Sequence, residues 1–188
     1  MSRDFPFAPA AGLREQASGW LAGSAEPVPA RLAATVMCLR DRPGGLEVFT
    51  VHRASTMAFA PSMHVFPGGG VDPRDADDLP WFGPSPQDWA GLLHTDVEPA
   101  RMLVAAAVRE VFEETGVLLA GPGPEALARP SASWLTDRRA LVDRTLGFGE
   151  LLRRDGLVLR ADLLSYRAHW TTPVFEPKRY DTRFFAAA

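Results

Sequence analysis

The sequence predicts a single domain of the α/β class, and three of its segments carry that prediction. Residues 31–41 are apolar and residues 46–54 alternate, and the Pro-Gly-Gly turn between them favours a strand pair. Residues 99–115 repeat apolar side chains at helical spacing and end at Gly116. Residues 169–177 and 180–188 read as two late strands joined by a polar loop. The length of 188 residues and the hydrophobic content of 46% suit one domain with a full core.

The composition argues against several classes of protein. The formal net charge of −3 gives no support to nucleic-acid binding through bulk electrostatics. The chain has no apolar run of about 18 residues that could span a membrane, and its first residues lack the apolar centre of a secretion signal. Cys38 is the single cysteine, so no disulfide can form within the chain. We therefore expect a cytoplasmic protein that binds neither nucleic acid nor a membrane.

The first half of the chain is expected to consist of a lead-in and the opening strands of the domain. Residues 1–30 form the lead-in, with a short helix from about Gly12 to Leu21, and the domain covers 31–188. Residues 64–72 read as a strand that runs into a glycine-rich turn. The stretch that follows is rich in Pro and Asp and predicts a loop or an insertion at about 76–100, with a short helix near 87–93.

The helix that follows the insertion is the most strongly predicted element. Thr95 or Asp96 can cap its N-terminus, Pro99 suits its first turn, and Gly116 suits its C-terminal end. Its buried stripe should consist of Leu103 or Val104, Val108, Val111 and Phe112. A second helix is expected within residues 136–154, although Gly147 and Gly149 weaken its pattern.

Three glutamates share one face near the end of this helix. Glu110 and Glu114 are four residues apart, and Glu113 lies three residues from Glu110. Like charges at this spacing repel each other, and the helix dipole disfavours anions at this end. One interpretation is a solvated acidic helix end. The other is a site for a divalent cation such as Mg²⁺, which prefers hard oxygen ligands and would offset the repulsion.

The segment that carries these glutamates resembles the signature of the Nudix hydrolases. Residues 109–117, REVFEETGV, match the second half of that signature without exception. The first half departs from it, because the position counted from Gly69 holds Asp75 where the family has glutamate, and an insertion then separates Asp75 from Arg109. At the uninterrupted spacing before Arg109 stands Arg101.

A finer resemblance covers residues 53–70, RASTMAFAPSMHVFPGGG, which look like the segment before the glycine turn of Nudix coenzyme A diphosphatases. Arg53 and the run 66–69 fall in register, whereas Ala58 and Ser62 replace an arginine and a glycine of that pattern. The peroxisomal-type branch is the most similar. It shares the HVFPGG sequence pattern, an insertion within the signature, and segments that resemble HWTTP and RYDTRFF near the end of this chain. The chain has no Ser-Lys-Leu ending.

The resemblance implies a Nudix fold, a mixed sheet sandwiched between helices, and a catalytic centre on the acidic helix face. Mg²⁺ or Mn²⁺ would be held by Glu110, Glu113 and Glu114, with Glu110 also a candidate base and Arg109 holding the carboxylates. The expected reaction is hydrolysis of a diphosphate linkage in a nucleotide derivative. For coenzyme A or acyl-coenzyme A, the products would be 3′,5′-ADP and phosphopantetheine or its acyl form.

Substrate contacts and rival interpretations follow from the same resemblance. The backbone at Gly68 and Gly69 would line the metal site, and Arg53 is either a contact to the substrate's phosphates or an ordinary surface charge. The alternative functions are a nucleotide-sensing or protein-binding module without hydrolysis, and a diphosphatase for ADP-ribose, NADH or dinucleoside polyphosphates.

A Nudix fold normally continues beyond a strand such as 180–188. Either the chain is truncated, or a partner such as a second copy covers that edge.

Overall fold

The computed structural model describes residues 12–23, 26–54 and 62–188 of the chain. Within these residues the main sheet is five-stranded and mixed, and β1 pairs in parallel with β10 and antiparallel with β2 and β5. Strand β10 also pairs antiparallel with β9, so β10 lies between β1 and β9. The strands are β1 (Arg31–Arg42), β2 (Gly45–Val48), β5 (Gly68–Gly70), β9 (Ser165–Thr171) and β10 (Tyr180–Ala187). The prediction of an α/β domain with a mixed sheet is confirmed.

The predicted hairpin at residues 31–54 is confirmed only as far as β2. Arg42 pairs with Gly45 across the turn, and Gly45 has a φ of 121°, which favours glycine. The prediction of one strand over 46–54 is wrong, because the chain separates after Val48 and forms β3 (Val51–His52), which pairs with β4 (His64–Val65). The side chains of Leu46 and Val48 remain 66% and 46% exposed, so no buried face fixes the whole segment in one register.

The glycine-rich segment forms an edge strand, and its prediction as a turn is wrong. Gly68, Gly69 and Gly70 pair with Thr35, Ala34 and Ala33 of β1. A Cβ atom at Gly68 would lie 2.4 Å from the carbonyl oxygen of Ala34, so a side chain there would collide with β1. The glycines therefore let the chain lie tightly against β1 as β5.

Helix α3 (Val97–Thr115) forms the centre of the core, and its predicted bounds are nearly correct. The helix ends at Gly116, which has a φ of 78°, while Asp96 lies at the N-cap position without a side-chain cap hydrogen bond. The predicted buried stripe is confirmed, since each of its members is fully buried: Leu103, Val104, Val108, Val111 and Phe112. The ring of Phe112 packs edge-on against Trp134, with the ring centroids 5.1 Å apart.

The segment predicted as a loop or insertion contains regular structure of its own. It begins with a short 3₁₀ helix, η1, and ends at the start of α3. Arg101 of α3 donates a hydrogen bond of 2.7 Å to the carbonyl oxygen of Asp77 and so ties the segment to the helix. The short helix predicted near 87–93 is confirmed as α2, which is capped by Ser85. The elements are η1 (Pro73–Ala76), β6 (Trp81–Phe82) and α2 (Pro86–Leu93).

The second predicted helix is divided into two. Residues 143–147 separate α4 (Trp134–Val142) from α5 (Phe148–Arg154), and Gly147 is the N-cap of α5 in an extended conformation. A small second sheet has the order β6-β8-β7 and includes β7 (Ala120–Gly121) and β8 (Val158–Arg160). The 3₁₀ helix η2 (Ala161–Leu163) leads from β8 towards β9.

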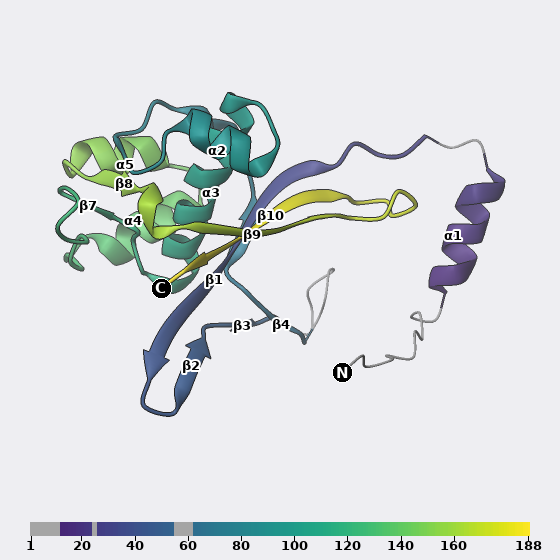
Figure 1. The fold of residues 1–188 in the computed structure, drawn as a ribbon, viewed down its shortest axis with the longest axis horizontal. Coiled ribbons are helices and arrows are strands. Elements are labelled where there is room, and N and C mark those ends of the chain that lie inside the picture. The colour runs from purple at the N-terminus through teal and green to yellow at the C-terminus, as the bar shows by residue number, and fades with distance from the viewer. Residues whose placement is uncertain (1–11, 24–25, 55–61) are drawn as a thin grey trace.

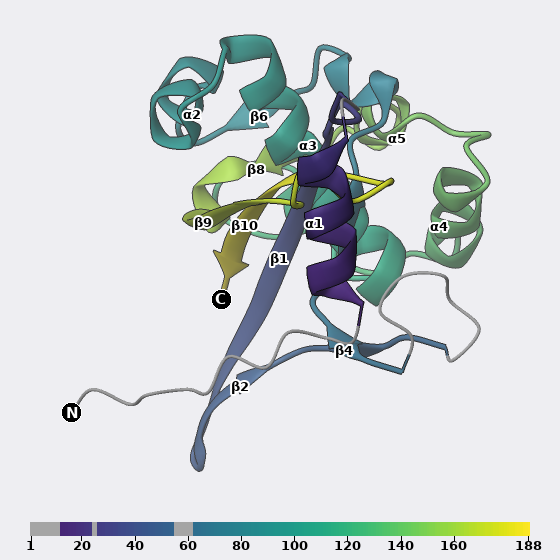
Figure 2. The same cartoon turned by 90° about the vertical axis from the view of Figure 1, so that its right-hand side faces the viewer.

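The helices α2 to α5 gather around one part of β1, and the β1–β2 hairpin projects away from them (Figure 1). Helix α1 (Leu13–Ala22) confirms the helix predicted in the lead-in. It buries none of its residues and stands apart from the rest of the molecule in Figure 1, whereas in Figure 2, which is turned by 90°, it lies between the viewer and the sheet. Among the described residues, no helix has both the length and the apolarity that crossing a membrane requires.

Candidate active site

The acidic face of α3 lies directly against the glycine strand β5. The carboxylate of Glu110 is so close to Gly69 that a Cβ atom at that glycine would lie 2.5 Å from Glu110 Oε1. One turn further along α3, Oε2 of Glu114 accepts a hydrogen bond of 3.3 Å from the backbone N–H of Gly68. The structure therefore brings together two predicted site segments that lie some forty residues apart in the sequence, despite the inserted segment between them.

Arg109 connects the carboxylates of this site to one another. Its Nη1 donates hydrogen bonds of 2.9 Å to Glu110 Oε1 and of 3.0 Å to Glu113 Oε1. Its Nη2 donates a bond of 3.0 Å to the carbonyl oxygen of Gly70, at the end of β5. The guanidinium is nearly buried, so these contacts fix the helix face against the glycine strand.

Asp75 completes the set of groups around Arg109. Both of its oxygens accept hydrogen bonds from that guanidinium, at 2.9 Å from Nε and 3.0 Å from Nη2. Asp75 is 1% exposed and also accepts a bond of 2.8 Å from the backbone N–H of Asp72, in a capping box at the start of η1. The residue in the family's first glutamate position therefore faces Arg109, and the shorter aspartate is held there by η1.

Burial changes the acidity of these groups. It raises the pKa of Glu110 to about 7, with a further increase from Glu113 and Glu114 and a decrease from Arg109. Burial alone would lower the pKa of Arg109, but its bonds to Asp75 and the charges of Glu110 and Glu113 raise it, so the guanidinium stays charged. Packing around the Glu114 carboxylate raises its pKa although part of that residue is open to solvent, while the Gly68 N–H and the charge of Arg53 oppose the change.

The donors at this site fit a hard divalent cation. Among the described residues no three Asp, Glu, His or Cys side chains converge as a ready metal cage. Mg²⁺ does not need such a cage, because one or two protein carboxylates, water and substrate phosphates complete its shell. Glu110 and Glu114 supply two carboxylates on one helix face, and Arg109 donates hydrogen bonds to one oxygen of Glu110 and to one oxygen of Glu113. The buried Glu110 and its like-charged neighbours are the arrangement that a bound cation would stabilise.

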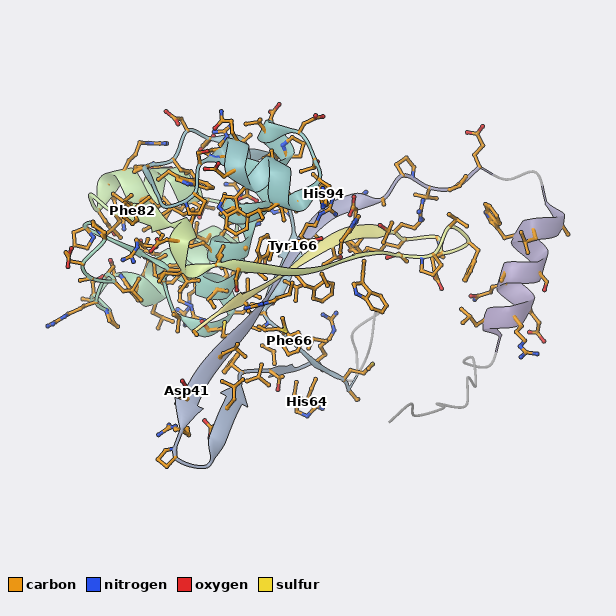
Figure 3. The ribbon with its side chains drawn as sticks, viewed as in Figure 1. Asp41, His64, Phe66, Phe82, His94 and Tyr166 are labelled. Carbon is orange, nitrogen blue, oxygen red and sulfur yellow. The ribbon has the colours of Figure 1, made fainter. Side chains whose placement is uncertain are left out.

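Two cavities open on either side of the glycine strand. One, of about 320 Å³, is lined by Glu110, Glu113 and Arg109 together with further residues of both charges. The other, of about 480 Å³, is lined by β5, by Arg53 and by side chains of β1 and β10. His64 and Phe66, labelled in Figure 3, also line this second cavity. The predicted residues Arg53, Gly68 and Gly69 thus share one cavity, while Ala58 lies outside the described residues.

Two groups at this site had not been singled out from the sequence. Arg138 of α4 donates a hydrogen bond of 2.7 Å to the carbonyl oxygen of Glu113 and so supports the C-terminal end of α3. Asp72 caps η1 and thereby holds Asp75 in place. Neither belongs to the Nudix-like motif, although an aspartate before Pro73 is a recognisable capping signal.

Comparisons with known proteins bear on the family and the fold of the chain. The chain is 30% identical to acyl-coenzyme A diphosphatase NUDT19 of Gallus gallus over 82% of its own length, and spans 54% of that protein. It therefore covers about half of this curated relative. A crystal structure of a NUDIX hydrolase from Alicyclobacillus acidocaldarius superposes with a TM-score of 0.66 and 31% identity, over 85% of this chain and 70% of that one. No protein-family model matches the chain.

Proposed function

The chain belongs to the Nudix hydrolase family, and we propose that it is a metal-dependent diphosphatase that cleaves coenzyme A or acyl-coenzyme A. The products would be 3′,5′-ADP and phosphopantetheine or its acyl form. The observation that carries this proposal is the contact of Glu110 and Glu114 with the backbone of Gly68 and Gly69. It places two carboxylates beside the glycine strand, which also lines the cavity that contains Arg53.

Mg²⁺ or Mn²⁺, when bound, would neutralise the diphosphate and lower the pKa of a bound water. Glu110 and Glu114 would be its direct protein ligands. Glu113, which is held by Arg109, would contribute through a water molecule. The backbone of Gly68 and Gly69 would line the site.

Hydrolysis requires that a water oxygen attack one phosphorus while the bond from that phosphorus to the bridging oxygen breaks. The bridging oxygen then leaves with the other phosphate group. Glu110 would also be the candidate to accept the proton of the attacking water, because its carboxylate lies against Gly69 at the same site. Arg109 acts as a positioning residue, since it fixes Glu110 and Glu113 and donates to Gly70.

The substrate part of the proposal has separate support. A curated relative bears the name acyl-coenzyme A diphosphatase. Arg53, which falls in register with the coenzyme A diphosphatase pattern, lines the cavity beside β5, and its charge acts on Glu114. A cation in this place suits a substrate that carries several phosphate groups.

A substrate panel tests the proposal. The purified chain is incubated with Mg²⁺ or Mn²⁺ and with coenzyme A, an acyl-coenzyme A, ADP-ribose, NADH or a diadenosine polyphosphate, and the products are identified by mass. We expect the coenzyme A compounds to give the highest kcat/KM and to yield 3′,5′-ADP. Preferential cleavage of another compound would overturn the substrate, and binding without cleavage of any compound would support a sensing module instead.

Glu114→Gln provides the matched test of mechanism. It should lower turnover by about 100-fold because it removes a charged ligand next to the reacting phosphate. Glu98→Gln is the control, since Glu98 is an exposed residue in the first turn of the same helix. Equal turnover in both variants would contradict the assigned role of Glu114.

A further inference from the structure

The cavity on the β10 side of the glycine strand has a charge that the other cavity lacks. The described residues that line it include Arg53 and Lys178 and no aspartate or glutamate. The cavity on the other side is lined by arginines and by acidic residues in equal number, so its charges offset one another. An anionic group that extends away from the metal site is therefore attracted to the Arg53–Lys178 cavity.

The wall of this cavity follows from strand alternation. Successive side chains of a strand point to opposite faces, and Tyr180, Thr182 and Phe184 of β10 all line the cavity. The next residue, Phe185, packs into the core on the other face, against Trp89. Together with Phe66, the rings of Tyr180 and Phe184 give the cavity aromatic surface on which a nucleotide base can stack.

Lys178 lies at the far end of this cavity from the carboxylates. It belongs to the loop between β9 and β10 (Figure 1), and its Nζ lies 5.5 Å from the centroid of the Tyr180 ring. Tyr180 pairs with Arg31 of β1, whereas Gly69 pairs with Ala34, three residues further along that strand. The separation along β1 is about 10 Å at the usual rise of about 3.3 Å per residue.

This arrangement places two cations at different distances from the site of cleavage. Arg53 is near enough to the metal site for its charge to act on Glu114. Lys178, on the loop beyond Tyr180, lies further along the strands from Gly69 and would meet a group that the substrate carries further out. A base held between the aromatic rings would put a phosphate on its own ribose within this outer region.

We propose that Lys178 is a specificity-determining residue that binds a phosphate on the ribose of the nucleotide, with the base against Tyr180. This inference rests on the proposed function, because coenzyme A carries a 3′-phosphate on its ribose in addition to the diphosphate that is cleaved. It adds a substrate contact on the β9–β10 loop, outside both the glutamate helix and the Arg53 segment. It predicts that coenzyme A is preferred over its 3′-dephospho form.

The sequence offers a direct probe, because Lys178 is its only lysine. Reductive methylation with ¹³C-formaldehyde keeps the charge of the lysine and labels one side chain besides the N-terminal amine. Lys178→Gln identifies the resonance by its loss. We expect adenosine 3′,5′-bisphosphate to shift this resonance, and adenosine 5′-monophosphate at equal saturation to leave it in place. Equal shifts, or no shift with either nucleotide, would overturn the assignment.

Kinetics provide the second readout. In Lys178→Gln the ratio of kcat/KM for coenzyme A over dephospho-coenzyme A should fall about tenfold, mainly through KM, as expected for one charge-assisted contact. Lys178→Arg should restore most of the ratio. Arg167→Gln removes an exposed cation from the neighbouring strand β9 and should leave the ratio at the wild-type value. An unchanged ratio in Lys178→Gln would contradict the proposal.

The two proposals can fail separately. If the protein hydrolyses coenzyme A but adenosine 3′,5′-bisphosphate does not shift the Lys178 resonance, the role proposed for Lys178 is wrong and the proposed function stands. If the resonance responds selectively to that nucleotide but no compound of the panel is cleaved, Lys178 binds the ribose phosphate and the proposed hydrolysis is wrong.

Discussion

Arg109 and Asp75 form a doubly hydrogen-bonded pair across 34 positions of the sequence, with Asp75 1% exposed. This pair joins the short helix after the glycine strand to the helix that carries the glutamates. The inserted segment connects these two helices, and the Arg109–Asp75 pair forms although that segment separates the two residues in the sequence. Because Arg109 also donates hydrogen bonds to Glu110 and Glu113, a substitution at Asp75 should alter the positions of these two carboxylates.

Asp75→Asn should lower the free energy of unfolding by about 3 kcal/mol, because it leaves the buried Arg109 with one fewer charged partner. Asp75→Glu, which restores the residue usual in the family, should also destabilise, by about 1–3 kcal/mol, because an extra methylene would shift the carboxylate from its bonds to Arg109 and to the Asp72 N–H. Urea unfolding measures both. Asp78→Asn, at an exposed position nearby, should stay within about 0.5 kcal/mol of the wild type. A more stable Asp75→Glu protein would contradict this account of the pair.

Gly69→Ala should lower metal-dependent hydrolysis by about 100-fold, because the new methyl group would displace the Glu110 carboxylate. The protein should still fold, since the collision is with the end of a side chain. Gly70→Ala is the matched control, because a Cβ atom there meets nothing within 4 Å. Turnover of both variants, with circular dichroism to verify folding, checks the prediction. Similar losses in the two variants would show that the contact with Glu110 is not what matters.

The acidity of Glu110 predicts how metal stabilisation depends on pH. Its pKa is raised from an ordinary 4.5 to about 7, so in the metal-free protein its contribution to stability is present below pH 4.5. That contribution is lost as the pH rises through 7, when a buried negative charge must form. Added Mg²⁺ should then raise the melting temperature more at pH 8 than at pH 6, and Glu110→Gln should reduce the difference. An equal rise at both pH values would argue against Glu110 as a ligand.

Local sequence signals predicted the parts of the fold whose periodicity and end residues agree. Helix α3 has a buried stripe at helical spacing and ends at Gly116, so its bounds could be stated to within two residues. The two late strands were also predicted, and they correspond to β9 and β10. In each case the side-chain pattern and the tertiary environment favour the same structure.

The errors occurred where neighbours outside the segment decide its structure. Glycines usually indicate a turn, but Gly68–Gly70 pair with β1 as a strand, and at Gly68 and Gly69 a side chain would collide with β1 and with Glu110. The alternation at residues 46–54 predicted one strand, yet Leu46 and Val48 have no buried surface to hold them to one register.

In the candidate site too, local sequence patterns identified some residues, while others depend on contacts between distant segments. The spacing of the glutamates and the Nudix-like motif nominated one face of α3 from the sequence. The partner of Arg109 could not be assigned with the insertion in between. Lys178 had no local signal at all, because an exposed lysine in a loop matters only through the cavity that β5 and β10 enclose.

Calorimetric titration of the protein with Mn²⁺ is the most direct test of the central claim that Glu110 and Glu114 form a metal site with the glycine strand. The wild type and Glu98→Gln should bind Mn²⁺ with equal affinity, and Glu114→Gln should bind at least about tenfold more weakly because a carboxylate ligand is lost. If Glu114→Gln binds Mn²⁺ as tightly as the wild type, or if the wild type binds none, the site described here does not hold the metal.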